Sequence, residues 1–138
     1  MNRLEELRAL ANSRASMRRR PSDIEHRIQC ACVTWFRAQY PNMRHSLFAV
    51  PNGGRRNAVT GSKLKSEGVL AGVSDLILLH RTAQHGALLI ELKTRIGRQS
   101  ELQRQWQRAV EQDGYKYIVC RSLEDFIEQV NDYIKDLI

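Results

Sequence analysis

Cysteine and long apolar runs are scarce in this 138-residue sequence, and each shortage excludes a class of protein. The three cysteines, Cys30, Cys32 and Cys120, lack the fourth ligand and the spacing of a zinc site, so we expect buried, reduced thiols. No stretch approaches the roughly 18 apolar residues of a membrane span, and the first residues lack the apolar run of a signal peptide. We therefore expect a cytoplasmic protein without a membrane partner.

Common nucleotide-binding and metal-binding motifs are also missing. No GxGxxG string occurs, and Gly61-Ser62-Lys63 lacks the spacing of a phosphate-binding P-loop. The four histidines show no metal-ligand spacing. We find no internal repeat and no low-complexity linker, and the length fits one domain with a core of its own.

Acidic residues are scarce in two parts of a chain whose net charge is +7. Residues 1–21 hold six arginines against two glutamates, a net charge of +4, and we expect a basic arm or helix there, ahead of a domain over residues 22–138. Residues 44–66 hold five lysines or arginines and no acid. These clusters favour an anionic partner, above all a nucleic acid.

Hydrophobic periodicity predicts an α/β domain. Apolar residues at helical spacing predict one helix from an N-cap at Ser22 to a stop at Pro41, and a second helix after Ser100. Two Leu- and Ile-rich runs, 74–80 and 87–93, are joined by a short polar link and predict a β-hairpin. The expected order is helix, strand, hairpin, helix, strand, helix, a mixed sheet with helices packed on it. The helix after the hairpin is expected to turn four apolar residues inward: Leu102, Trp106, Ala109 and Val110.

Three charged residues of the predicted hairpin fall at one end of the sheet. Glu91 and Lys93 alternate with Leu92, so both point to the same face of their strand. A turn near residues 83 and 84 would place Asp75 across from residue 91 or 92. Two carboxylates side by side suit Mg²⁺, a hard cation that takes oxygen ligands. Such an ion can activate water and offset phosphodiester charge, and Lys93 would stabilise the anionic transition state.

The same pattern also has a purely structural interpretation. Acid and lysine two residues apart on an exposed strand commonly form a surface ion pair worth less than about 1 kcal/mol. However, Glu91 follows the apolar run "LLI", and Asp75 opens a second apolar strand, so neither strand is expected to be wholly exposed. The pattern alone leaves both interpretations open.

Longer strings of the sequence resemble a known family. Asp75 followed by Glu91-x-Lys93 resembles the PD-(D/E)xK nuclease superfamily. Its VRR-NUC branch is similar to this chain from about Ser22 to Ile127, through "PNGG", "GVLAGVSDLILL", "LLIELKTRIGRQSELQRQW" and "GYKYIVCRSLEDF". Ser74 stands where the superfamily pattern has proline. The resemblance implies a restriction-endonuclease-like α/β fold, with a mixed central sheet flanked by helices.

The resemblance also implies roles for the hairpin residues. Asp75 and Glu91 would be ligands of Mg²⁺ or Mn²⁺, with the Leu92 carbonyl as a third ligand. Lys93 would be the catalytic lysine.

Two helical residues would join them as catalytic groups. Glu25 matches the acid that the first helix of such nucleases contributes, and Gln103 matches the glutamine of the helix after the hairpin. Both also fit capping boxes, Ser22 to Glu25 and Ser100 to Gln103, so a structural role stays open for each.

The basic stretch 50–68 is a candidate DNA-binding surface. Pro51 and Asn52-Gly53 favour a tight turn, and glycine permits close approach of the backbone to a ligand. An ordinary Asn-Gly turn is the structural alternative. We expect phosphate contacts beside the metal from seven residues: Asn52, Gly53, Gly54, Arg55, Arg56, Lys63 and Lys65.

The sequence thus predicts a Mg²⁺- or Mn²⁺-dependent endonuclease that hydrolyses phosphodiester bonds in DNA. The resemblance implies a small stand-alone enzyme of phage or bacterial type, working in the cytoplasm, that of a phage-infected host included. It also implies a homodimer that cuts branched DNA such as Holliday junctions. One alternative is a basic DNA-binding module without catalysis. Another is a nuclease for ordinary duplex whose basic arm docks a partner.

Overall fold

The computed structural model describes residues 2–8, 21–51 and 58–136 of the chain. Residues 3–8 are helical, and residues 1 and 9–20 of the predicted basic arm lie outside the described residues. The helices within the described ranges include none that is both long and apolar enough to cross a membrane. The elements from residue 21 onward are α2 (Pro21–Gln39), η1 (Pro41–Ser46), β1 (Leu47–Ala49), α3 (Ala58–Ser66), β2 (Leu76–Leu78), β3 (Leu88–Leu92), α4 (Glu101–Gln112), β4 (Lys116–Cys120) and α5 (Leu123–Lys135).

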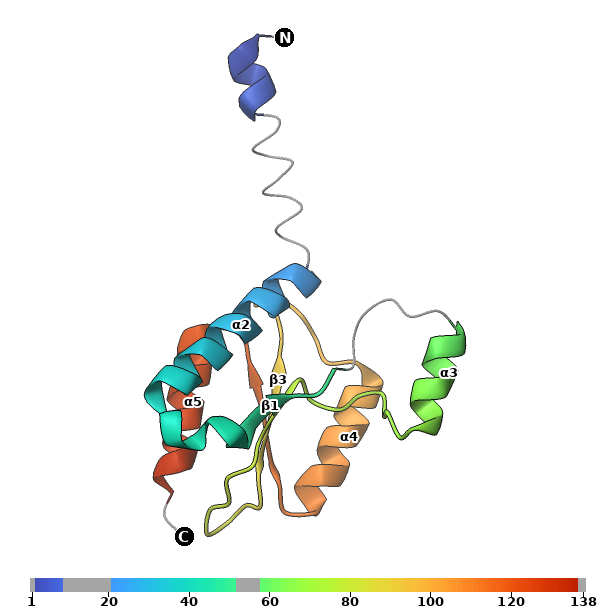
Figure 1. The fold of residues 1–138 in the computed structure, drawn as a ribbon, viewed down its shortest axis with the longest axis vertical. Coiled ribbons are helices and arrows are strands. Elements are labelled where there is room, and N and C mark those ends of the chain that lie inside the picture. The colour runs from blue at the N-terminus through green and yellow to red at the C-terminus, as the bar shows by residue number, and fades with distance from the viewer. Residues whose placement is uncertain (1, 9–20, 52–57, 137–138) are drawn as a thin grey trace.

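The four strands form one mixed sheet in the order β1-β2-β3-β4 (Figure 1). β1 pairs antiparallel with β2, and β2 pairs antiparallel with β3, which confirms the predicted hairpin. β4 pairs parallel with β3 after the crossover through α4. The predicted order of helix, strand, hairpin, helix, strand, helix is therefore confirmed.

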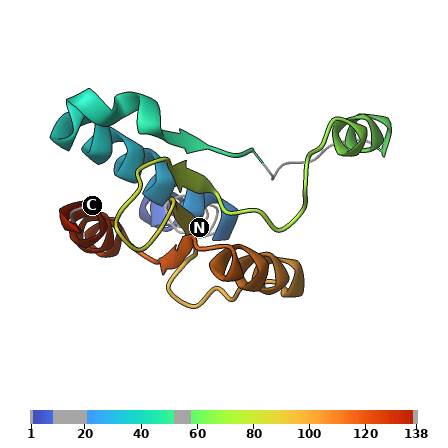
Figure 2. The same cartoon turned by 90° about the horizontal axis from the view of Figure 1, so that it is seen from below.

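The helices cover the sheet from both sides. Figure 2 shows α2 and α5 against one face of the sheet and α4 against the other. The core lies on the α2 and α5 face, where alternate strand residues such as Leu76, Ile90 and Cys120 pack against Phe36 and Phe126. Glu91 and Tyr117 project to the α4 face, so a polar end of the sheet lies under that helix.

Two predictions about α2 are wrong. The helix begins at Pro21, so Ser22 lies inside its first turn and is not an N-cap. Proline suits a first helical position because its missing N–H would have no intrahelical acceptor there. Cys30 is exposed, whereas Cys32 and Cys120 are buried as predicted, because the 100° step per residue turns Cys30 away from the core.

The inner face of α4 also differs from the prediction. Leu102 is 54% exposed and Ala109 is exposed, although both were expected to face inward. The residues turned toward the sheet are Gln103, Trp106, Gln107 and Val110, a stripe one residue further round. This rotation occurs because α4 begins over the polar end of the sheet, where glutamine finds hydrogen-bond partners and leucine does not.

Candidate active site

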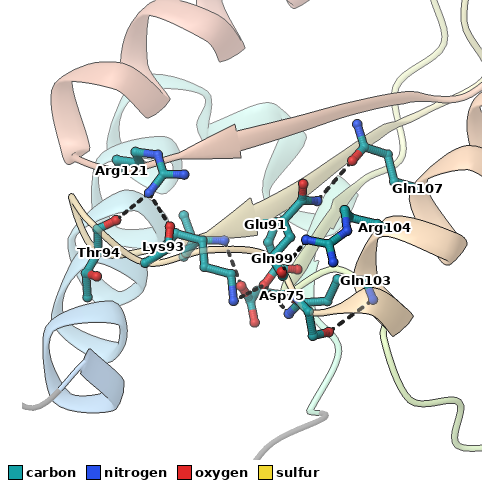
Figure 3. A network of polar contacts seen from close by, with 12 residues as sticks. Asp75, Glu91, Lys93, Thr94, Gln99, Gln103, Arg104, Gln107 and Arg121 are labelled. Carbon is teal, nitrogen blue, oxygen red and sulfur yellow. Dashed lines mark hydrogen bonds and ion pairs between the residues drawn. The ribbon is translucent and has the colours of Figure 1, made fainter.

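The hairpin brings Asp75 opposite Glu91. The β2–β3 register pairs Leu76 with Ile90, and the next pair outward is Asp75 with Glu91. The Asp75 carboxylate accepts a hydrogen bond of 2.7 Å from the backbone N–H of Leu92 (Figure 3). This contact fixes the carboxylate at the point where β3 ends, as the predicted turn near residues 83 and 84 required.

Glu91 is a buried carboxylate that contacts Gln103, Lys93 and Tyr117 besides Asp75. It is 2% exposed. Its Oε1 atom accepts a hydrogen bond of 2.9 Å from Gln103 Nε2 and lies 3.9 Å from Lys93 Nζ. Its Oε2 atom accepts a hydrogen bond of 3.4 Å from the Tyr117 hydroxyl. The surface-ion-pair interpretation is therefore wrong for Glu91, because an ion pair with a 2% exposed partner is not a solvated edge contact.

The surroundings of Glu91 disfavour its charge. Burial, and then the charge and side-chain hydrogen bond of neighbouring Asp75, raise the pKa of Glu91 from 4.5 to about 8. Lys93 acts in the opposite direction and lowers this pKa, while Glu25 raises it further. The carboxyl groups thus form one coupled acidic cluster in which the ammonium of Lys93 compensates only part of the repulsion.

Glu25 joins this cluster from α2. Burial raises the pKa of the Glu25 carboxyl, the Lys93 charge lowers it, and Asp75 raises it. The backbone of Thr94 also lowers the pKa of this carboxyl. These interactions place Glu25 beside the end of β3, next to the residues with which the family resemblance grouped it.

Gln103 serves the helix and the site together. Ser100 and Gln103 form the predicted capping box of α4, with Gln103 N–H donating to Ser100 Oγ and Ser100 N–H donating to Gln103 Oε1. The free amide of the same side chain donates to Glu91. The cap fixes the rotamer of Gln103, and the fixed rotamer aims the amide at Glu91.

Several polar residues of the site were not identified from the sequence. Tyr117 reaches Glu91 from β4, and Gln99 Nε2 donates to the Tyr117 hydroxyl at 3.2 Å and to Gln107 Oε1 at 2.9 Å. The Arg121 guanidinium holds the loop that follows Lys93 through carbonyl contacts. Alternation along residues 115–120 could have placed Tyr117 on one face, but the parallel register that brings it to Glu91 carries no local sequence signal.

The donor set fits a hard divalent cation. Within the described ranges, no three His, Cys, Asp or Glu side chains form a group able to hold a metal ion. The metal ligands expected from the sequence are only two carboxylates, Asp75 and Glu91, with the backbone carbonyl of Leu92. Such a set suits Mg²⁺, which is commonly held by one or two carboxylates together with waters and phosphate. The Leu92 N–H points at Asp75, and the carbonyl of a strand residue points to the same edge as its N–H.

The predicted DNA-binding stretch is only partly described. Asn52, Gly53, Gly54, Arg55 and Arg56 lie outside the described residues. The stretch leaves β1 beside the site, because Val50 N–H donates a 2.9 Å hydrogen bond to the Asp75 carbonyl. Lys63 and Lys65 are exposed on α3, which lies well to one side of the sheet (Figures 1 and 2). The structure therefore does not bring these two lysines to the carboxylates.

Comparisons with known proteins agree with this fold. A family model described as the VRR-NUC domain matches residues 15–124. A solved structure described as a VRR_NUC domain protein superposes with a TM-score of 0.72 at 22% identity, over 82% of this chain and 89% of that one. No curated protein matched the chain. The mixed sheet flanked by helices is of the restriction-endonuclease-like α/β type. Because the family model spans most of the sequence, the chain belongs to the VRR-NUC family, which is of nuclease type.

Proposed function

We propose that the chain is a Mg²⁺- or Mn²⁺-dependent endonuclease that hydrolyses phosphodiester bonds in DNA. The observation that carries this proposal is the buried Glu91 carboxylate, which faces Asp75 and has Lys93 Nζ 3.9 Å away. A buried acid pair destabilises a free protein unless a cation compensates it. The arrangement therefore supports ligand binding and not the stability of the fold.

Each residue has a separate task in this proposal. Asp75, Glu91 and the Leu92 carbonyl would hold the metal, and Glu25 would add negative charge beside it. When bound, the ion would supply an activated water and offset charge on the scissile phosphate. Lys93 would orient the attacking water or stabilise the developing negative charge. Gln103 would keep Glu91 in place, because its amide donates a hydrogen bond to Oε1 of the carboxylate and so fixes the orientation of that group.

The finer proposal is a homodimer that acts on branched DNA such as Holliday junctions. The family resemblance supports it, and the described residues of one chain hold one such cluster of carboxylates, whereas cutting both strands of a junction takes two. The net charge of +7 supports an anionic substrate. The basic loop that begins beside Asp75 supports phosphate binding next to the site.

The test is cleavage of a labelled four-way junction and a linear duplex of matched sequence, with Mg²⁺, Mn²⁺ or EDTA. We expect cutting with either metal, none with EDTA, and faster cutting of the junction. Glu91→Gln and Lys93→Ala should abolish cutting and keep DNA binding. Glu111→Gln, which neutralises an exposed glutamate of α4, and Lys135→Ala at the end of α5 are the matched controls and should cut normally.

The outcomes separate the proposal from its rival. DNA binding without cutting under either metal would overturn the nuclease and establish a non-catalytic DNA-binding module. Equal cutting of junction and duplex would retain the nuclease and overturn only branch preference. A monomer by light scattering at cleavage concentrations would overturn the homodimer.

A further inference from the structure

The loop after Lys93 is fixed by one guanidinium. Arg121 Nη1 donates to the Thr94 carbonyl at 2.7 Å and to the Gly97 carbonyl at 2.6 Å. Gly97 N–H in turn donates to the Thr94 carbonyl at 3.2 Å, which closes a tight turn. A Cβ at position 97 would lie 2.9 Å from Thr94 Oγ1, so the turn also depends on glycine. The loop is therefore preorganised.

This fixed loop presents an apolar side chain to solvent. Ile96 is 89% exposed, the largest exposure of the large hydrophobic residues in the described ranges. Arg95 and Arg98 flank it and are also exposed. An isolated exposed apolar residue needs no explanation. Ile96 differs because several hydrogen bonds hold the backbone of its loop, and because it lies three residues after Lys93. Two arginines beside it suit phosphate groups.

A cavity opens next to Ile96. Its volume is about 380 Å³, within the range of small-ligand sites. Ile24 and Thr94 line it, Ile24 precedes Glu25, and Thr94 follows Lys93, so the cavity adjoins the carboxylate cluster. Figure 3 shows Thr94 and Arg121 on one side of Asp75 and Glu91, with Gln103 on the other. The lining residues are Pro21, Ile24, Thr94, Arg95, Ile96 and Arg121.

The chemistry of the walls suits a nucleobase. Pro21, Ile24 and Ile96 offer apolar surface to the faces of a ring. The exposed Arg95 can stack on the ring or bind its phosphate, while Arg121 holds the loop. A base inside a duplex must first be unstacked and unpaired to enter such a cavity, which has a free-energy cost that an unpaired base does not incur. The cavity thus discriminates in favour of a nucleotide that is already unpaired.

We propose that the cavity between the start of α2 and the loop 94–97 binds an unpaired nucleobase next to the scissile phosphate, with Ile96 as its outer wall. This inference rests on the proposed function, and it supplies a physical reason for a preference for branched or frayed DNA. The base that enters is one released at a branch, a flap or a frayed end.

The test places 2-aminopurine, a fluorescent base analogue, at each position around the branch of a splayed duplex, and at the same positions of the matched duplex. Fluorescence is read with protein in EDTA, so that no cutting occurs. We expect one position, or two adjacent ones, to change fluorescence at least about twofold in splayed DNA only. Ile96→Ala should remove that change and, in Mg²⁺, reduce the ratio of splayed to matched duplex cutting several-fold, because the variant loses apolar surface that the base would cover.

The control is Leu79→Ala, which truncates a 58% exposed leucine beyond the opposite end of β2 from Asp75. It should leave both the fluorescence and the cutting ratio unchanged. Both side chains are exposed, so neither truncation should lower the melting temperature appreciably, and thermal unfolding checks this.

Failure of this inference is distinguishable from failure of the nuclease proposal. DNA binding and cutting with no responsive 2-aminopurine position, or with an unchanged ratio in Ile96→Ala, would overturn the base site and keep the nuclease. The cavity would then have another occupant, such as a further part of this chain. No cutting of any DNA by the wild-type protein would overturn the nuclease, and absence of a localised fluorescence change in the same samples would overturn the base site with it.

Discussion

Glu91 is held by donors and repelled by acids at the same time. Gln103 and Tyr117 donate to it, Lys93 lies 3.9 Å away, and Asp75 with Glu25 opposes its ionisation. The net effect raises the pKa of Glu91 to about 8. Because of this raised pKa, the stability of the metal-free protein should depend on pH. A cation bound to the Glu91 carboxylate should offset the loss of stability at alkaline pH.

We predict that Glu91→Gln stabilises the metal-free protein at alkaline pH. The unfolded chain ionises Glu91 near pH 4.5, and the folded chain does so near pH 8. Between these values the folded state binds more protons, so the free energy of unfolding falls as pH rises. The variant lacks this titration. Its melting temperature in EDTA should exceed that of the wild type by several degrees at about pH 9, and the difference should shrink toward pH 5.

Metal provides the control for that prediction. Mg²⁺ should raise the melting temperature of the wild type at about pH 9, since a ligand of the folded state stabilises it. It should not do so for Glu91→Gln. Equal melting temperatures of the two proteins in EDTA across the pH range would contradict the raised pKa.

Variants of Ser100 and Gln103 can distinguish the capping of α4 from the positioning of Glu91. Ser100→Ala removes the N-cap acceptor of α4 and should destabilise the fold by about 1 kcal/mol with cleavage retained below the melting transition. Gln103→Ala removes the amide that donates to Glu91 as well, so it should reduce cleavage several-fold at a comparable loss of stability. Urea unfolding and single-turnover cleavage measure the two effects. Equal cleavage by both variants would show that Gln103 acts only as a cap.

Among the elements, the loop between β3 and α4 depends on a residue from a different strand. Arg121 follows β4, and its guanidinium gathers the carbonyls of the loop. The backbone of Thr94, in the same loop, acts on the Glu25 carboxyl and lowers its pKa. Loop geometry and the position of Glu25 are therefore coupled through Arg121.

We predict that Arg121→Gln loosens this loop. Trypsin should then cut after Arg95 or Arg98 several-fold faster in native buffer, because local opening exposes the backbone. Cleavage of DNA should fall, since the backbone of Thr94 no longer has a fixed direction. Arg81→Ala, at an exposed position of the hairpin, is the control and should change neither rate. Unchanged proteolysis in Arg121→Gln would mean that the loop is held without the guanidinium.

For the molecule as a whole, the positive charge is spread beyond the carboxylate cluster. Lys63 and Lys65 are exposed on α3, away from Asp75 and Glu91. Lysines at such a distance can bind phosphates of the flanking duplex but cannot assist the reacting one. We therefore expect phosphate contacts of these lysines to contribute to affinity and not to the chemical step.

We predict that the double substitution Lys63→Ala and Lys65→Ala weakens DNA binding and lowers the salt dependence of log K by about 2, one for each lost phosphate contact. The cleavage rate at saturating DNA should stay unchanged. Fluorescence anisotropy over a range of salt concentrations measures the slope. Lys135→Ala, on the last turn of α5, should leave the slope unchanged. A fall in the saturating rate would place the two lysines at the reacting phosphate.

The sequence by itself determined the hairpin and its acidic end. Its polar link is short and its flanking runs are apolar, so the turn was predictable near residues 83 and 84, which placed Asp75 across from residue 91 or 92; the register of the sheet decided for Glu91. Alternation then dictates that Lys93 lies on the Glu91 side. The capping box of Ser100 and Gln103 was equally local. These features depend only on neighbours in sequence, where periodicity and hydrogen-bond chemistry suffice.

Tertiary structure alone decided the parallel register of β4, the rotation of α4 and the contacts of Arg121 with the loop after β3. Helical periodicity suggested that Leu102 faces inward, but contact with the polar end of the sheet turned Gln103 there instead. Tyr117 reaches Glu91 only because β4 returns parallel to β3 after a crossover, and Arg121 reaches a loop more than twenty residues earlier. Such contacts join distant segments, so packing, and not local pattern, determines them.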